Sequence, residues 1–223
     1  MTSRPPTRDE IREISREAVE IFMQDGLSCC LFGSAACELY GRRRAPNDVD
    51  IVVMTRTRDV ESLKGLLCRN SEDGRFYTRA SRMPNATYRV LWYRLPGQRR
   101  SCKVDILIPD SSNGLNIPFV GNLRLEWVNG LPVLPFLVTL ILKVQGWRDH
   151  GNSSREDFRA KVEVDERDIN EMLRIARRRG EDVARETWIP RWFLNHGDDL
   201  VQEYVNAVGG GRLWELIGFQ PFY

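Results

Sequence analysis

The chain has 223 residues, and its 33 basic and 31 acidic side chains leave a formal net charge of +2. A hydrophobic fraction of 42% is sufficient for a packed core, so the composition predicts a folded, soluble protein. The charge balance gives no overall bias towards nucleic acid or a membrane surface, and basic character is confined to local clusters. These clusters are residues 42–44, Arg99 and Arg100 with Lys103, and residues 177–179.

The first half of the chain predicts an α/β unit. Thr7 and Glu10 form a capping box at the start of an amphipathic helix that ends near Gly26. Turn residues and apolar runs then predict strands over 27–32, 48–53, 76–80, 88–93 and 103–108, helices over 35–40 and from 60, and an Asn-Gly hairpin over 127–133. These elements together predict a mixed sheet flanked by helices.

The second half of the chain has a helical pattern from Pro135 onwards. Further helices are expected over 165–179, 181–187 and 198–208, followed by a break at 209–211 and a short apolar segment over 213–219. The expected fold class is therefore α+β, with an α/β domain over 1–132 and a helical domain over 133–223.

Cysteine usage and the N-terminal sequence bear on the compartment. Five cysteines form an odd set without metal-ligand spacing, and several stand in apolar segments where a thiol acts as a small hydrophobe. The N-terminus lacks the apolar core of a signal peptide, and the apolar stretch near 136–142 is too short to span a bilayer. We therefore expect a cytoplasmic protein without a membrane-embedded segment.

Three aspartates carry the strongest chemical signal. Asp48 and Asp50 alternate along one strand, so both carboxylates point to the same face with their Cα atoms about 7 Å apart. Asp105 stands in a second apolar run and completes the set if the two strands are neighbours. Oxygen ligands of this kind suit Mg²⁺, and the pair is not stable there without a cation.

These residues resemble the signature of the DNA polymerase beta-like nucleotidyltransferase superfamily. The resemblance rests on residues 31–34 (Leu-Phe-Gly-Ser), on residues 48–52 (Asp-Val-Asp-Ile-Val) and on the later Asp105. Arg44 and Asn47 also stand where many members have a basic and a small polar residue. The resemblance implies a nucleotidyltransferase fold with a catalytic domain over 1–132.

The second half is similar to the helical part of the AbiEii-like nucleotidyltransferases of the abortive-infection toxin type. Residues 131–143 and 147–149, with Asp165 and Asp168, carry this similarity. It implies that Lys143 and one of the two aspartates belong to the active site, and the sequence does not choose between Asp165 and Asp168.

The activity implied is Mg²⁺-dependent transfer of a nucleoside monophosphate from a nucleoside triphosphate, ATP among them, with release of pyrophosphate. Asp48, Asp50 and Asp105 would hold two Mg²⁺ ions, and Gly33 and Ser34, with Arg44, would bind the triphosphate. Lys143 would neutralise charge on the leaving group. The acceptor hydroxyl stays open between an RNA or tRNA 3′ end, a protein and a small molecule, and the oligomeric state is not determined.

Each assignment has a plainer structural interpretation. The aspartates fit a solvated strand edge, and Gly33 and Ser34 fit a turn and a helix cap. Lys143 fits a stem that runs along the core to solvent, Asp165 and Asp168 fit exposed first-turn acids, and residues 42–44 fit a solvated loop. For His150 and His196 a structural role is expected. The alternative function is a catalytically inactive nucleotide- or RNA-binding module on the same fold.

Overall fold

The computed structural model describes residues 4–82, 86–109 and 115–221. The chain forms two compact units, one built from residues 1–39, 43–111 and 119–134 and the other from residues 40–42, 112–118 and 135–223. Each unit is described by itself below. The division into two domains at residue 132 stays a prediction.

A seven-stranded mixed sheet with the order β3-β4-β5-β2-β1-β7-β6 forms the first unit. The pairs β2–β5 and β1–β7 are parallel, and the other neighbours are antiparallel. The two central strands β2 and β5 bury one apolar face, which includes Val49, Ile51, Val104 and Ile106. The strands are β1 (Cys29–Phe32), β2 (Asp48–Val53), β3 (Phe76–Ala80), β4 (Arg89–Arg94), β5 (Ser101–Leu107), β6 (Glu126–Val128) and β7 (Leu131–Val133).

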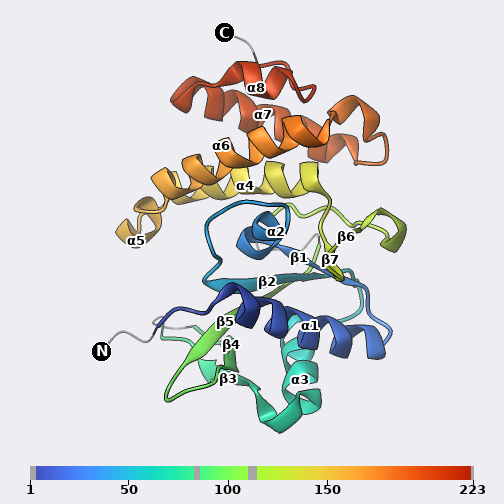
Figure 1. Ribbon diagram of the computed structural model, residues 1–223, viewed down its shortest axis with the longest axis vertical. Helices are drawn as coiled ribbons and strands as arrows, with labels where there is room; N and C mark the ends of the chain where they lie inside the picture. Colours follow the sequence, from blue (N-terminus) through green and yellow to red (C-terminus); the bar gives the residue numbers. More distant parts are fainter. Residues whose placement is uncertain (1–3, 83–85, 110–114, 222–223) are drawn as a thin grey trace. The chain divides into compact units, whose positions relative to one another are not determined.

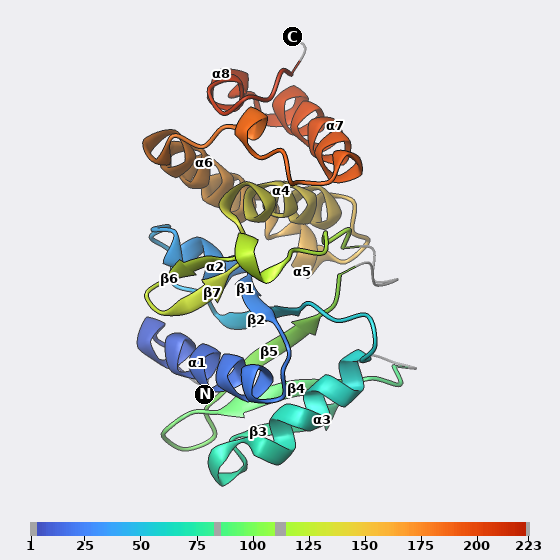
Figure 2. The ribbon, with the colours of Figure 1, turned by 90° about the vertical axis from the view of Figure 1, so that its right-hand side faces the viewer.

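Two helices of the first unit, α1 (Arg8–Gln24) and α3 (Val60–Asn70), contact each other and lie along the same face of the sheet (Figure 2). The apolar side of α1, including Ile14 and Phe22, is fully buried. The expected capping box is present, since Thr7 accepts from the Glu10 amide and Glu10 accepts from the Thr7 amide. The remaining elements of this unit are α2 (Gly33–Leu39) and the 3-10 turns η1 (Glu72–Gly74) and η2 (Asn122–Arg124).

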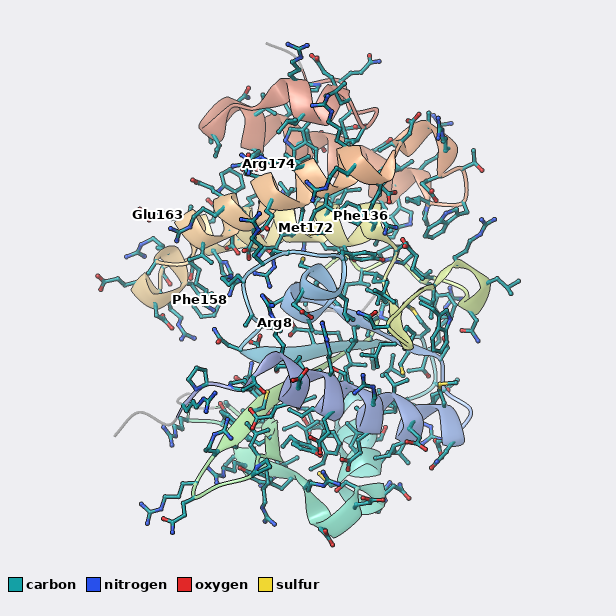
Figure 3. All side chains as sticks on the ribbon, viewed as in Figure 1. Arg8, Phe136, Phe158, Glu163, Met172 and Arg174 are labelled. Carbon is teal, nitrogen blue, oxygen red and sulfur yellow. The ribbon has the colours of Figure 1, made fainter. Side chains whose placement is uncertain are left out.

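The regular elements among the described residues of the second unit are α-helices and one 3-10 turn (Figure 1). Helix α4 contacts α5, α6 and α7, and its first seven residues are all buried, as expected for a helix whose first half is apolar on every side. Helix α6 is amphipathic, with Met172 buried and with Glu163 and Arg174 exposed (Figure 3). The elements are α4 (Phe136–Gly151), α5 (Glu156–Arg159), α6 (Val162–Arg179), η3 (Val183–Arg185), α7 (Arg191–Val208) and α8 (Gly211–Glu215).

Most of the expected elements are confirmed, including the hairpin turn, where Asn129 and Gly130 both have positive φ. The helix expected over 181–187 is wrong, because only the turn Val183–Arg185 forms there. Helix α7 begins at Arg191 rather than at 198, since Pro190 precedes it as the N-cap. Within the part of the chain that the structure describes, no helix is both long enough and apolar enough to cross a membrane.

The cysteines are all free thiols, and four of the five are buried. Burial raises the pKa of Cys29 to about 12, so its thiol stays protonated at neutral pH. These side chains therefore act as small apolar groups in the core, as the sequence predicts.

The Glu10 carboxylate joins the start of α1 to the turn after β4. Arg100 donates to both of its oxygens, at 2.7 and 2.8 Å. The hydrogen bonds from Arg100 and from the Thr7 amide lower the pKa of Glu10 to about 2 from a reference of 4.5. A depressed carboxyl pKa contributes stability above the unfolded-state pKa, and this contribution is lost as the pH falls.

We predict that Glu10→Gln lowers the free energy of unfolding by about 1 kcal/mol at pH 7. The difference from the parent protein should be constant down to about pH 5 and should shrink steadily between about pH 4 and pH 2. Urea unfolding at a series of pH values measures it, with Glu20→Gln on the exposed side of the same helix as the control. If the difference in unfolding free energy between Glu10→Gln and the parent protein did not change with pH, a stabilising ion pair between Glu10 and Arg100 would be contradicted.

Candidate active site

The register between β2 and β5 positions three carboxylates on one face of the sheet. The parallel pairing sets Asp50 opposite Asp105 and Asp48 opposite Lys103. The intervening residues Val49 and Ile51 are fully buried on the other face. The strands are therefore neighbours, as the sequence requires for a three-carboxylate site.

One oxygen from each of Asp48, Asp50 and Asp105 lies within 4.8 Å of the others. All three side chains are half-buried, so the cluster is accessible to a ligand. Three hard oxygen donors at this spacing fit a divalent cation such as Mg²⁺, which takes carboxylate oxygens and keeps several waters. The residues present thus fit the metal that the sequence predicts.

Lys103 is part of this cluster and was not predicted to be there. Its Nζ lies 2.5 Å from Asp105 Oδ2. Burial by itself lowers the pKa of Lys103, but Asp105 and the two carboxylates of β2 outweigh this effect and raise it. The ammonium group therefore stays charged and offsets part of the repulsion among the carboxylates. The sequence could have indicated this position of Lys103, because residues two apart on a strand, such as Lys103 and Asp105, point to the same face.

Gly33 lies against the carboxylate cluster at the end of β1. Its predecessor Phe32 is paired with Asp50 across the sheet. Gly33 has φ +60°, and a Cβ built on it would lie 2.3 Å from Asp50 Oδ2. Glycine is therefore required here both for the backbone conformation and for the close approach of the carboxylate.

The next residue, Ser34, contacts the loop that contains Arg43 and Arg44. Arg44 Nη2 donates to Ser34 Oγ at 3.2 Å. The same loop is held to α1, because Arg8 donates to the Arg43 carbonyl. The structure thus brings Gly33, Ser34 and Arg44 together with the three aspartates in the first unit.

Lys143 belongs to the second unit, where it lies on α4. Its Nζ is 2.5 Å from Asp165 Oδ1 and 3.2 Å from Asp168 Oδ2. Both aspartates are buried, so the expectation that they are exposed first-turn acids is wrong. Lys143 is 14% exposed and does not run freely to solvent. The sequence left Asp165 and Asp168 as alternatives, and both pair with this lysine.

Two more side chains complete this charge network. Arg42 is fully buried and donates to Asp168 Oδ1 at 2.9 Å, so it is not part of a solvated loop. His150 Nδ1 lies 2.5 Å from Asp165 Oδ2. No local sequence pattern indicates the Arg42 contact, since Arg42 and Asp168 are 126 residues apart. A buried network of this kind requires that every charge keeps its partners.

Comparison with known proteins supports the fold. A crystal structure of an antigenic nucleotidyltransferase-like protein from Paracoccidioides brasiliensis is similar over 97% of both chains, with a TM-score of 0.66 and 14% sequence identity. The chain therefore has a nucleotidyltransferase-like fold, with a mixed sheet, flanking helices and a helical C-terminal half. No protein-family model matches the sequence, and a search of curated proteins finds no match.

We predict that Gly33→Ala lowers the free energy of unfolding by about 2 kcal/mol, because it adds a clash to a strained backbone. It should also weaken Mn²⁺ binding, since the new methyl group displaces the Asp50 carboxylate. Gly74→Ala is the matched control, because Gly74 has φ +59° with nothing within 4 Å of a built Cβ. Urea unfolding and calorimetric Mn²⁺ titration measure both effects. If Gly33→Ala and Gly74→Ala lost the same stability and neither changed Mn²⁺ binding, the close contact of Gly33 with Asp50 would be contradicted.

For the charge network of the second unit, we predict that Lys143→Met lowers the free energy of unfolding by about 3 kcal/mol. The substitution removes the cation between two buried carboxylates. Adding Asp165→Asn should recover part of this loss, because it removes one of the two buried carboxylates that no longer have the lysine as a partner. Urea unfolding of both variants measures the effect, and the exposed Lys161→Met serves as the control. A loss no larger than that of the control would show that the lysine is dispensable for folding.

Proposed function

We propose that the protein is a Mg²⁺-dependent nucleotidyltransferase. It transfers a nucleoside monophosphate from a nucleoside triphosphate to an acceptor hydroxyl and releases pyrophosphate. The observation that carries the proposal is the convergence of Asp48, Asp50 and Asp105 within 4.8 Å on an accessible face. The fold, which is similar to that of a nucleotidyltransferase-like protein, is compatible with this reaction class.

The proposed roles follow from the position of each group. Asp48 and Asp50 would bind the two expected Mg²⁺ ions, and Asp105 would hold the second ion from the neighbouring strand. Mg²⁺, when bound, neutralises phosphate charge and makes the acceptor hydroxyl more acidic. The missing side chain at Gly33 lets the Asp50 carboxylate lie against the backbone, and the triphosphate would bind beside this turn. Arg44, held by Ser34, offers a guanidinium to the phosphate oxygens.

The bond changes of the proposed step balance. The acceptor oxygen forms a bond to the α-phosphorus, and the bond between the α-phosphorus and the bridging oxygen of the β-phosphate breaks. The hydroxyl proton passes to the Asp105 carboxylate, and pyrophosphate carries away the electron pair of the broken bond. Lys103 donates to Asp105 and so positions this carboxylate.

Other sequence-based assignments stay predictions. Among them are the leaving-group role of Lys143, the similarity to AbiEii-like enzymes, ATP as a substrate and the cytoplasmic location. The contacts of Lys143 with Asp165 and Asp168 support a structural role within the second unit. The two roles are compatible, since a lysine fixed by carboxylates also has a fixed position.

We predict that Asp50→Asn retains the fold and lowers pyrophosphate release by about a hundredfold or more, because the carboxylate pair that holds the cation is lost. The assay supplies each labelled triphosphate with Mg²⁺, total RNA and cell proteins, and it records which macromolecule gains label. Asp73→Asn makes the same chemical change at an exposed turn and serves as the control.

Two results would contradict the proposal. Equal transfer by the parent protein and Asp50→Asn would remove the aspartates from the reaction. Binding of nucleotide or RNA by the parent protein without any Mg²⁺-dependent pyrophosphate release would instead favour the non-catalytic module on the same fold.

A further inference from the structure

A basic pocket lies on the first unit beyond the edge of the carboxylate cluster. It has a volume of about 470 Å³ and lies over β3, β4 and the turn that leads into β5. Four arginines and no acidic residue line it. The lining residues are Tyr77, Arg79, Arg94, Leu95, Gly97, Arg99, Arg100 and Ser101.

Strand register puts this pocket and the carboxylates on the same face of the sheet. Trp92 is paired with Lys103, and Arg94 is paired with Ser101, across β4 and β5. Tyr77 is paired with Trp92 across β3 and β4. Because paired residues point to the same side, these side chains share a face with Lys103 and therefore with Asp105. Ser101 and Asp105 are four residues apart on β5, or about 13 Å along the strand.

The charge of the pocket is available to a ligand. Arg79 and Arg94 are exposed, and neither forms an ion pair with a carboxylate among the described residues. Both guanidinium groups instead pack on the Tyr77 ring, with carbon-to-centroid distances of 5.0 and 5.2 Å. The ring therefore holds two cations close together without neutralising them.

Arg99 adds a third arginine at a cost in backbone energy. It has φ +58°, a conformation that a residue other than glycine adopts only against steric strain. Its neighbour Arg100 is occupied by Glu10. The turn thus places an arginine at the pocket where glycine would be the more stable residue.

The opposite side of the same sheet has the reverse charge. A second pocket there is lined by Glu13, Glu17, Glu20 and Glu72, together with Arg16 and Arg75. An anionic chain would therefore be attracted to one side of these strands and repelled from the other. Half-buried Tyr77 and Trp92 add aromatic surface to the basic side.

We infer that this pocket binds a single-stranded polynucleotide, whose end then reaches the carboxylate cluster as the acceptor. The inference rests on the proposed function for the transfer step, but the binding itself does not require it. Arginines contact the phosphates, and half-buried Trp92 on the same face offers aromatic surface to an unstacked base, a combination found on surfaces that bind single-stranded nucleic acid. A few nucleotides of a single-stranded polynucleotide are long enough to span the distance of about 13 Å between the pocket and the carboxylate cluster.

The test measures fluorescence anisotropy with labelled single strands of about 12 nucleotides, as RNA and as DNA, without Mg²⁺ or triphosphate. We expect the parent protein to bind with a strong dependence on salt. Combined Arg79→Glu and Arg94→Glu should weaken binding about tenfold or more and should make the salt dependence shallower. The RNA and DNA arms identify which sugar the face accepts.

Arg99→Gly protects the test against a folding defect. It should weaken binding while leaving the unfolding temperature equal or higher, because glycine removes the backbone strain. The matched control combines Arg16→Glu with Arg58→Glu, which makes the same change of net charge at the acidic pocket and at the ion pair with Asp25. This control should bind as the parent protein does.

The inference and the proposed function fail in different ways. Equal weakening in the control, equal competition by poly-glutamate at matched charge, or no binding at about 50 mM salt would overturn the polynucleotide site. Asp50→Asn should bind the strand as tightly as the parent protein. If the protein released pyrophosphate and labelled a protein acceptor but did not bind the polynucleotide, the inference would be overturned and the proposed transferase activity would stand.

Discussion

The parallel register between β2 and β5 is the constraint on which the candidate site depends. A shift of one residue would turn Asp105 to the opposite face and leave Asp48 and Asp50 without a third ligand. The register is held from the other side of the sheet, where Val49, Ile51, Val104 and Ile106 are buried. Apolar burial on one face thus holds like charges together on the other, and the nearby ammonium of the β5 lysine reduces the repulsion among them.

Charge is used differently in the two units. The three carboxylates of the first unit are half-buried, which suits a site that must admit a cation and a substrate. The network around Lys143 is largely buried and pairs opposite charges, with Asp165 and Asp168 each less than 6% exposed. A buried network of this type costs much desolvation and is stable only while complete, so it fixes the packing of α4 against α6.

Fold and function rest on different observations. At 14% identity the likeness to the fungal nucleotidyltransferase-like protein shows the fold alone, so the reaction class has to be argued from the side chains. The three aspartates are the basis of the proposed chemistry with a triphosphate. The acceptor is a separate question, and the basic pocket over β3, β4 and the turn before β5 is the site we infer for it.

The sequence by itself determined the features of this protein that depend only on residues close together in the chain. The capping box of Thr7 and Glu10, the Asn129-Gly130 turn and the common face of Asp48 and Asp50 are local, because backbone periodicity and turn conformation act over a few residues. Residues far apart in the chain meet only through tertiary structure, and no local pattern encodes such contacts. Strand register decided that Asp105 joins the pair and that Lys103 shares the site. It also decided that Arg79 and Arg94 lie on the same face of the sheet. Helix packing decided that Arg42 is buried against Asp168.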